Sequence, residues 1–274
     1  YKRQHQQRRN ADRHAGHSPR TFAITPRNNG DILLFLVICA EKQNVPKPAI
    51  CDDSRMARTA RASKGGICYH VINRGNGRST VYHAASDYRF FINLMGKACE
   101  RIPMRILSYC LMPNHFHLVL WPMGDGDLSL WMQWLMTCHV RRYHRLRHTS
   151  GRVWQGRFKA FAIQQDSHLL TVMRYVERNP VRARLVRTAA DWEWSSISRS
   201  ASGLRETLIT PAPVPKPGNW LELVDAPQNQ DEVDAVRRCA TRNAPYGTST
   251  WAGETAESLG LEASLRPLGR PRRI

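Results

Sequence analysis

The stretch "MPNHFHLVLWP" (112–122) decides how the rest of the chain is arranged. It places His115 and His117 two positions apart, directly before the apolar run "LVL". Side chains alternate between the two faces of a β-strand, so residues i and i+2 point the same way. If this run is a strand, both imidazoles emerge from one face of a sheet. Two such imidazoles are half of a metal site, although packed or solvated histidines are the ordinary alternative.

The segments around this stretch predict an α+β fold. Periodicity-two runs rich in β-branched residues indicate strands, and apolar residues at 3.6-residue spacing indicate helices. The predicted strands are 67–75, 105–122 (two strands, separated at Pro113 and Asn114) and 153–163, and the predicted helices are 85–101, 128–147 and 167–178. The order β, α, β, β, α, β, α is typical of a ferredoxin-like antiparallel sheet with helices on one face.

Composition divides the chain into three segments. Residues 1–55 are rich in Arg, Asn, Gln and His, so we expect a disordered or non-native N-terminal extension with a genuine start at Met56. A cleaved signal peptide with "ILLFLVICA" (32–40) as its apolar region is the alternative, disfavoured by the polar residues before it. Residues 56–198 hold the predicted domain. In residues 199–274, "TPAPVPKPG" predicts a Pro-rich linker that leads into a basic DNA-binding C-terminal tail.

The charge balance indicates a polyanionic partner. The chain has 41 Lys and Arg against 22 Asp and Glu, a net charge of +19, which favours nucleic acid through counterion release. A basic membrane-surface protein competes, but the longest apolar run falls short of the roughly 20 residues that span a bilayer. Seven cysteines without a CxxC pair predict reduced thiols in a cytoplasmic protein.

The last predicted helix adds two polar residues to the histidine pair. Tyr175 and Asn179 are four residues apart, so both side chains project from one face of a helix. Two imidazoles and an amide oxygen would suit a divalent ion that also binds a phosphate oxygen. Two alternatives stay open: Tyr175 is a core aromatic, and Asn179 is the N-cap of a new helix that starts at Pro180.

Four motifs together resemble the REP-associated tyrosine transposases, a branch of the single-tyrosine HUH transposases. They are "YHVINRG" (69–75), "YCLMPNHFHLVLWP" (109–122), "VWQGRFKAF" (153–161) and "RYVERNPVRARLV" (174–186), and residues 247–273 extend the likeness into the tail. The resemblance implies the HUH nuclease fold. It also implies a metal-dependent endonuclease and strand transferase of the cytoplasm and nucleoid that acts on single-stranded DNA at hairpins of palindromic repeats.

Carried over by position, the resemblance implies a metal site at His115, His117 and Asn179 for Mg²⁺ or Mn²⁺, with Tyr175 as the nucleophile. A phenol, with an ordinary pKa of about 10, attacks phosphorus poorly unless the phosphodiester is polarised, which is the task of the metal. The product is a 5′-phosphotyrosine ester, which a second 3′-hydroxyl can attack to join new ends. A catalytically inactive hairpin-binding protein is the alternative, and a hydrolase that activates water is a third possibility.

Basic patches are the candidate DNA contacts, with a solvated charged face as the alternative. Gly75 lies in a loop whose backbone could approach DNA closely, and "GRPRR" in the tail resembles elements that enter the minor groove. The predicted DNA-binding residues are Arg74, Asn76, Arg141, Arg142, Arg145, Arg157, Lys159, Arg270 and Arg272. Monomer and homodimer both remain open.

Overall fold

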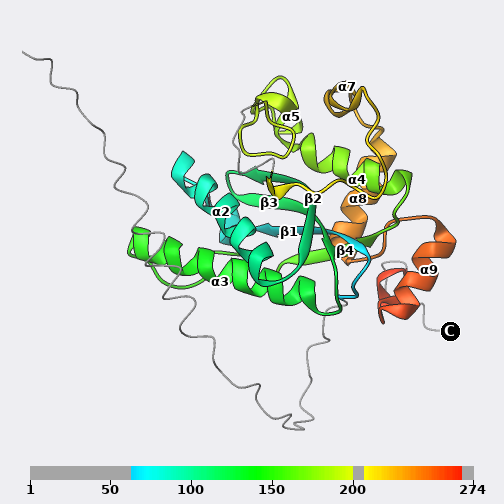
Figure 1. Cartoon of the computed structure of the whole chain (residues 1–274), viewed down its shortest axis with the longest axis horizontal. Helices are drawn as coiled ribbons and strands as arrows, with labels where there is room; N and C mark the ends of the chain where they lie inside the picture. The colour runs from blue at the N-terminus through cyan, green and yellow to red at the C-terminus, as the bar shows by residue number, and fades with distance from the viewer. Residues whose placement is uncertain (1–62, 200–206, 267–274) are drawn as a thin grey trace, which may run out of the picture. The chain divides into compact units, whose positions relative to one another are not determined.

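The computed structural model describes residues 63–199 and 207–266 (Figure 1). The predicted extension 1–55 and the tail residues Arg270 and Arg272 lie outside the described residues. The strands are β1 (Cys68–Arg74), β2 (Met104–Met112), β3 (His115–Pro122) and β4 (Lys159–Ile163). The helices are α2 (Ala85–Arg101), α3 (Asp127–Arg147), α4 (Ser167–Glu177), α5 (Asn179–Arg182), α7 (Trp220–Asp225), α8 (Gln230–Arg242) and α9 (Ser249–Ser258), with single 3₁₀ turns at Asn76–Arg78, Ala189–Asp191 and Glu262–Ser264.

The four strands form one antiparallel sheet in the order β2-β3-β1-β4. This is the strand order of a ferredoxin-like sheet, so the predicted fold class is confirmed. In the β1–β3 register, Ile72 lies opposite His117 and Arg74 opposite His115. Of the predicted run 153–163, only 159–163 pairs as a strand; before it, Trp154 makes an isolated bridge to Gly75.

The loop 75–82 hydrogen-bonds to the turn between β2 and β3, directly before the two histidines. The carbonyl of Pro113 accepts the backbone N–H groups of Val81 and Tyr82, and the carbonyl of Asn114 accepts that of Gly75 at 2.7 Å. A Cβ on Gly75 would lie 2.2 Å from the carbonyl oxygen of Ser79. The close approach that requires glycine here is therefore to the protein's own backbone.

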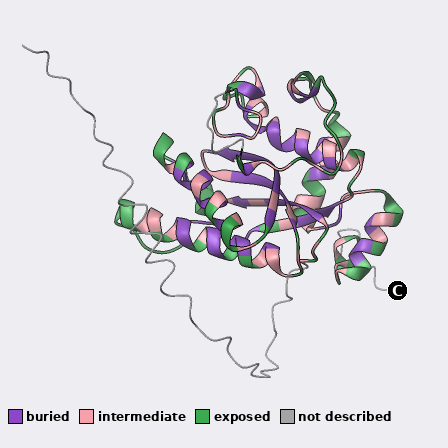
Figure 2. Ribbon diagram, in the orientation of Figure 1, coloured by how far each residue is buried: buried purple, intermediate pink, exposed green. Residues whose placement is uncertain are grey.

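Both faces of the sheet are covered, whereas the prediction placed helices on one face. Helices α2 and α3 pack on the first face, where Phe91 of α2 contacts Phe116 of β3 with ring centroids 5.3 Å apart. Helix α4 covers the other face, to which the histidines of β3 belong (Figures 1 and 2). Val172 and Val176 of α4 are buried in the same cluster as Val119 of β3.

The segment predicted as linker and tail folds onto the α4 face. Trp220 and Val224 of α7 and Val233 and Val236 of α8 are buried in the same cluster as Val176. The domain of the described residues therefore does not end at 198, because these apolar side chains complete its core. Residues 210–219, directly before α7, form no helix or strand, as their prolines predict.

Segments outside the strands cap both edges of the sheet. Ser195 bridges Cys110 and Ile209 bridges Ile106 at the β2 edge, while Tyr246 bridges Ile163 at the β4 edge. The backbone groups that an open edge would offer to another strand are partly used inside the chain.

Candidate active site

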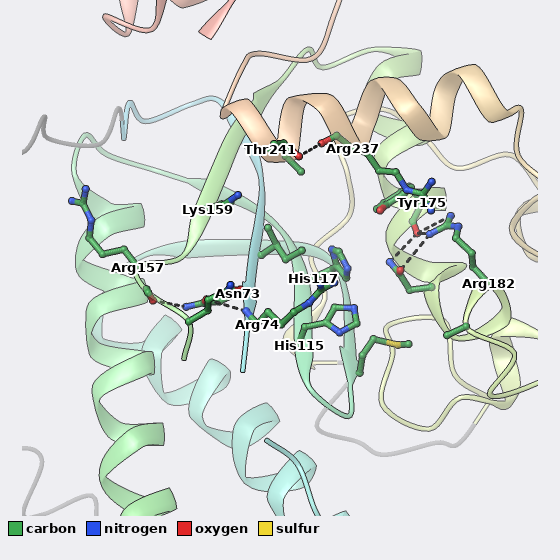
Figure 3. Close-up of a pocket in the computed structure, with 17 residues that line it drawn as sticks. Asn73, Arg74, His115, His117, Arg157, Lys159, Tyr175, Arg182, Arg237 and Thr241 are labelled. Carbon is green, nitrogen blue, oxygen red and sulfur yellow. Dashed lines mark hydrogen bonds between the residues drawn. The ribbon is translucent and has the colours of Figure 1, made fainter. Parts of the chain in front are cut away.

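A cavity of about 810 Å³ lies where β1, β3 and the N-terminal end of β4 face α4, α5 and α8 (Figure 3). Its lining brings together His115, His117, Tyr175 and Asn179, the four residues predicted from the sequence. Five cationic side chains share the lining: Arg74, Arg157, Lys159, Arg182 and Arg237. No carboxylate is present among the described residues that line it, so the cavity is strongly electropositive.

The histidine pair sits side by side on β3, as the alternation of strand side chains predicts. The ring centroids of His115 and His117 are 5.1 Å apart. Burial lowers the pKa of His115 to about 4, aided by the charge of Arg74, and burial also lowers the pKa of His117 well below 6.5. Both imidazoles are therefore neutral at neutral pH, the state in which imidazole binds metal.

Each imidazole of the pair has a hydrogen-bond partner at Nδ1. Nδ1 of His115 lies 2.7 Å from Oδ1 of Asn114, and Nδ1 of His117 lies 2.9 Å from Nε2 of His70. Within the described residues, neither Nε2 atom has a hydrogen-bond partner. Such contacts behind a ligand orient its ring in protein metal sites.

Tyr175 stands across from the pair on α4 (Figure 3). Its ring centroid is 5.9 Å from that of His117, with the two planes at 83°. The guanidinium of Arg182 lies 4.2 Å from the centre of the phenol ring, a cation–π contact. The side chain is 8% exposed, so Tyr175 is packed like a core aromatic while it lines the cavity.

Asn179 joins α4 to α5 and is not a side-chain N-cap. Its Nδ2 donates to the carbonyls of Tyr175 and Val176 at 3.1 and 3.3 Å, which satisfies the C-terminal end of α4. Its Oδ1 accepts from Arg182 at 3.3 Å. An amide oxygen has two lone pairs, so this long contact leaves one for a ligand.

The donor set fits a divalent metal in part. Two neutral imidazoles and one amide oxygen are candidate ligands, but the described residues hold no cluster of three His, Cys, Asp or Glu side chains that could bind a metal. A metal here would complete its coordination with oxygen ligands from water or from a substrate. A phosphodiester carries such oxygens and the negative charge that the cationic lining favours.

The predicted DNA-contact residues divide into three groups. Arg74, Arg157 and Lys159 line the cavity. Arg141 lines a second hollow of about 700 Å³, which shares Asn73, Gly156 and Arg157 with the first. Asn76, Arg142 and Arg145 line neither hollow, and Arg142 lies 4.1 Å from the ring of Phe90 on α2.

Three site residues were not predicted from the sequence: His70, Arg182 and Arg237. Arg182 follows Tyr175 by seven residues, a helical spacing that indicates the same face. Arg237 lies on α8, with Thr241 beside it on the cavity wall, and no pattern in the sequence connects that helix to the histidines.

Comparison with known proteins defines the class. Residues 63–179 match the family described as "Transposase IS200 like". The REP-associated tyrosine transposase of Escherichia coli is 25% identical over 141 residues, covering 51% of this chain and 81% of that protein. A protein of Haemophilus influenzae assigned to the same group is 24% identical over 148 residues, covering 50% of this chain and 82% of its own.

A solved structure of a REP-associated tyrosine transposase bound to a REP hairpin is 21% identical, with a TM-score of 0.45, over 64% of this chain and 92% of that one. The match of residues 63–179 is therefore to a family of transposases, which are enzymes that cut and join DNA. Over about half of its length, the chain is similar to REP-associated tyrosine transposases. Among the described residues, no helix is both long and apolar enough to cross a bilayer.

Proposed function

We propose that this transposase is a metal-dependent endonuclease and strand transferase that acts on single-stranded DNA at hairpins of palindromic repeats, through a 5′-phosphotyrosine intermediate at Tyr175. The observation that carries the proposal is that Tyr175, His115 and His117 meet in a cavity with five cationic side chains and no carboxylate among its described lining residues. Such a lining favours a phosphodiester over a neutral or cationic substrate.

The proposed cleavage step is a transesterification at phosphorus. The Tyr175 oxygen forms a bond to phosphorus, the bond to the 3′ oxygen breaks, and the phenol proton is balanced by the proton that the released 3′-hydroxyl gains. In the joining step another 3′-hydroxyl attacks the phosphotyrosine and releases the phenol. His115, His117 and Asn179 would hold Mg²⁺ or Mn²⁺, which supplies Lewis-acid polarisation of a phosphate oxygen.

The chain's own residues have distinct tasks in this proposal. Arg182 stacks on Tyr175 and keeps its ring facing the histidines. Arg74, Arg157 and Lys159 bind backbone phosphates along one wall, and Arg237 closes the opposite wall from α8 (Figure 3). The capped edges of the sheet favour a monomer, so light scattering in solution should give the mass of one chain.

The test is denaturing electrophoresis of 5′- and 3′-labelled single-stranded hairpin DNA after incubation with the protein. Wild type and Tyr175→Phe are compared with Mg²⁺, with Mn²⁺ and with chelator. The proposal expects a metal-dependent adduct that survives denaturation, on the fragment 3′ of the cut and absent from Tyr175→Phe.

Three other outcomes contradict parts of the proposal. Cutting by Tyr175→Phe without an adduct would indicate a hydrolase that activates water. Hairpin binding with no cut, across a range of hairpin sequences, would indicate an inactive DNA-binding protein. An adduct that still forms in chelator would contradict the proposed role of the metal and would agree with the proposed role of Tyr175.

A further inference from the structure

A third imidazole lies directly behind the histidine pair. His70 is on β1, the strand next to the pair, and its side chain has no exposed surface. Its Nε2 is 2.9 Å from Nδ1 of His117, and the two rings are within 10° of parallel, with centroids 5.0 Å apart. Phe161 on β4 and Tyr175 on α4 meet the His70 ring edge to face at 4.9 and 6.2 Å, which fixes its orientation.

A hydrogen bond between two imidazole nitrogens contains one proton, so one ring donates and the other accepts. If His117 donates from Nδ1, its Nε2 offers a lone pair to the cavity. If His70 donates from Nε2, His117 carries its own proton on Nε2 and cannot bind a metal through that atom. The direction of this one bond therefore decides whether His117 is a metal ligand.

The partner of His115 shows the arrangement that a ligand requires. Asn114 presents its amide oxygen, which only accepts, so His115 donates from Nδ1 and keeps a lone pair on Nε2. His70 offers the same kind of acceptor to His117 through its Nε2.

Burial of the His70 imidazole costs folding free energy, and its hydrogen bond to His117 explains why a histidine is present at this position. Its Nδ1 is buried without a hydrogen-bond partner among the described residues, and such an unsatisfied polar atom costs roughly 1–3 kcal/mol. An aliphatic side chain would avoid that cost at a position between two core strands. The bond to His117 is the polar contact that an aliphatic residue could not make.

We infer that His70 is a positioning residue that accepts a hydrogen bond from Nδ1 of His117 and so directs the Nε2 lone pair of His117 into the cavity. His70 is not itself a ligand, because its Nε2 faces His117 and its Nδ1 is buried. The inference rests on the divalent metal of the proposed function.

The test measures Mn²⁺ affinity from the electron paramagnetic resonance signal of free Mn²⁺, which requires no DNA and no cleavage. His70→Leu removes the acceptor and should weaken binding roughly 10–100-fold, the usual effect of losing such a partner. His70→Gln can place an amide oxygen near the former Nε2 and should bind close to wild type. His139→Leu, at a buried histidine on the opposite face of the sheet, should leave the affinity unchanged.

Equal Mn²⁺ affinity in wild type and His70→Leu would overturn the inference and leave the proposed function intact. An equal loss of Mn²⁺ affinity in His70→Leu and His70→Gln would do the same. A wild type that binds no Mn²⁺ would instead refute the metal of the proposed function. If the variants do not fold, ¹⁵N NMR of the wild-type imidazoles with Mg²⁺ decides. His117 should be protonated at Nδ1, and protonation of His70 at Nε2 in that sample would overturn the inference.

Discussion

Glu177 anchors the C-terminal segment to the helix that carries Tyr175, and its replacement should loosen that segment. The carboxylate is fully buried and accepts three hydrogen bonds: from Ser196 Oγ at 2.8 Å, from Trp220 Nε1 at 2.6 Å and from Lys216 Nζ at 3.1 Å. The first and third bind Oε1, and the second binds Oε2. Glu177→Gln keeps the shape but has only one oxygen, so its amide N–H₂ must face at least one of these donors.

The structure sets the expected size of the effect. Loss of one charge-assisted hydrogen bond in a buried site costs about 1.5–3 kcal/mol. Loss of the ion pair with Lys216 lowers the free energy of unfolding further, but by less than the loss of a fully buried pair would. The reason is that the Lys216 side chain is 32% exposed and can turn to solvent. We expect roughly 2–4 kcal/mol in total, which for a domain of this size lowers Tm by roughly 5–15 °C.

Thermal and urea unfolding followed by circular dichroism measure this loss. Glu100→Gln is the matched control, because its pair with Lys97 is on the surface and should cost no more than about 1 kcal/mol. In the double variant with Trp220→Phe, the cost of Glu177→Gln should fall, since the unpaired N–H is gone. A Glu177→Gln protein as stable as the Glu100→Gln control would refute the reasoning.

Three further predictions concern pH, the β2–β3 turn and DNA affinity. Burial lowers the pKa of His139 to about 3, below its unfolded value near 6.5, so stability is complete above that value and falls with pH as the unfolded chain takes up protons. Between about pH 7.5 and 5.5, wild type should lose about 1.4 kcal/mol more than His139→Gln in urea unfolding, and equal losses would contradict this. Gly75→Ala should cost roughly 1–3 kcal/mol in the same assay, because its Cβ would overlap the Ser79 carbonyl. Gly218→Ala, with open space around its Cβ, is the control; equal stability of the two variants would show that the loop adapts. Arg237→Ala should weaken hairpin binding and reduce its salt slope by about 1, whereas Arg238→Ala, outside the cavity lining, should not; similar effects of both would place the DNA elsewhere.

The residues that could be predicted from the sequence are those related by local periodicity. The two-residue spacing of His115 and His117 placed both on one face of β3, and the four-residue spacing of Tyr175 and Asn179 placed both on the cavity. Neither inference depends on which strands are neighbours in the sheet. His70 could not be assigned in this way, because its contact with His117 runs diagonally between strands and depends on the β1–β3 register.

The C-terminal helices show a different reason for failure. In α8, Val233, Val236 and Ala240 recur at helical spacing, and Asn229 caps the helix by accepting from the N–H of Asp231. That pattern was available in the sequence, but the Pro-rich composition before it indicated a linker and tail. Prolines limit only the segment that contains them, and the helices beyond can still bury apolar side chains.

The docking of this segment has a consequence for the site that composition could not indicate. Arg174 of α4 and Arg178, which directly follows α4, donate to backbone carbonyls at the end of α7, including that of Leu223 at 2.6 Å. Arg182 of α5 donates to the side chain of Gln228 at 3.0 Å. Helix α4, which carries Tyr175, therefore packs against the sheet on one side and against α7 and α8 on the other. Because α8 also supplies Arg237 to the cavity, the position of Tyr175 and the cationic wall opposite the histidines depend on the same packed segment.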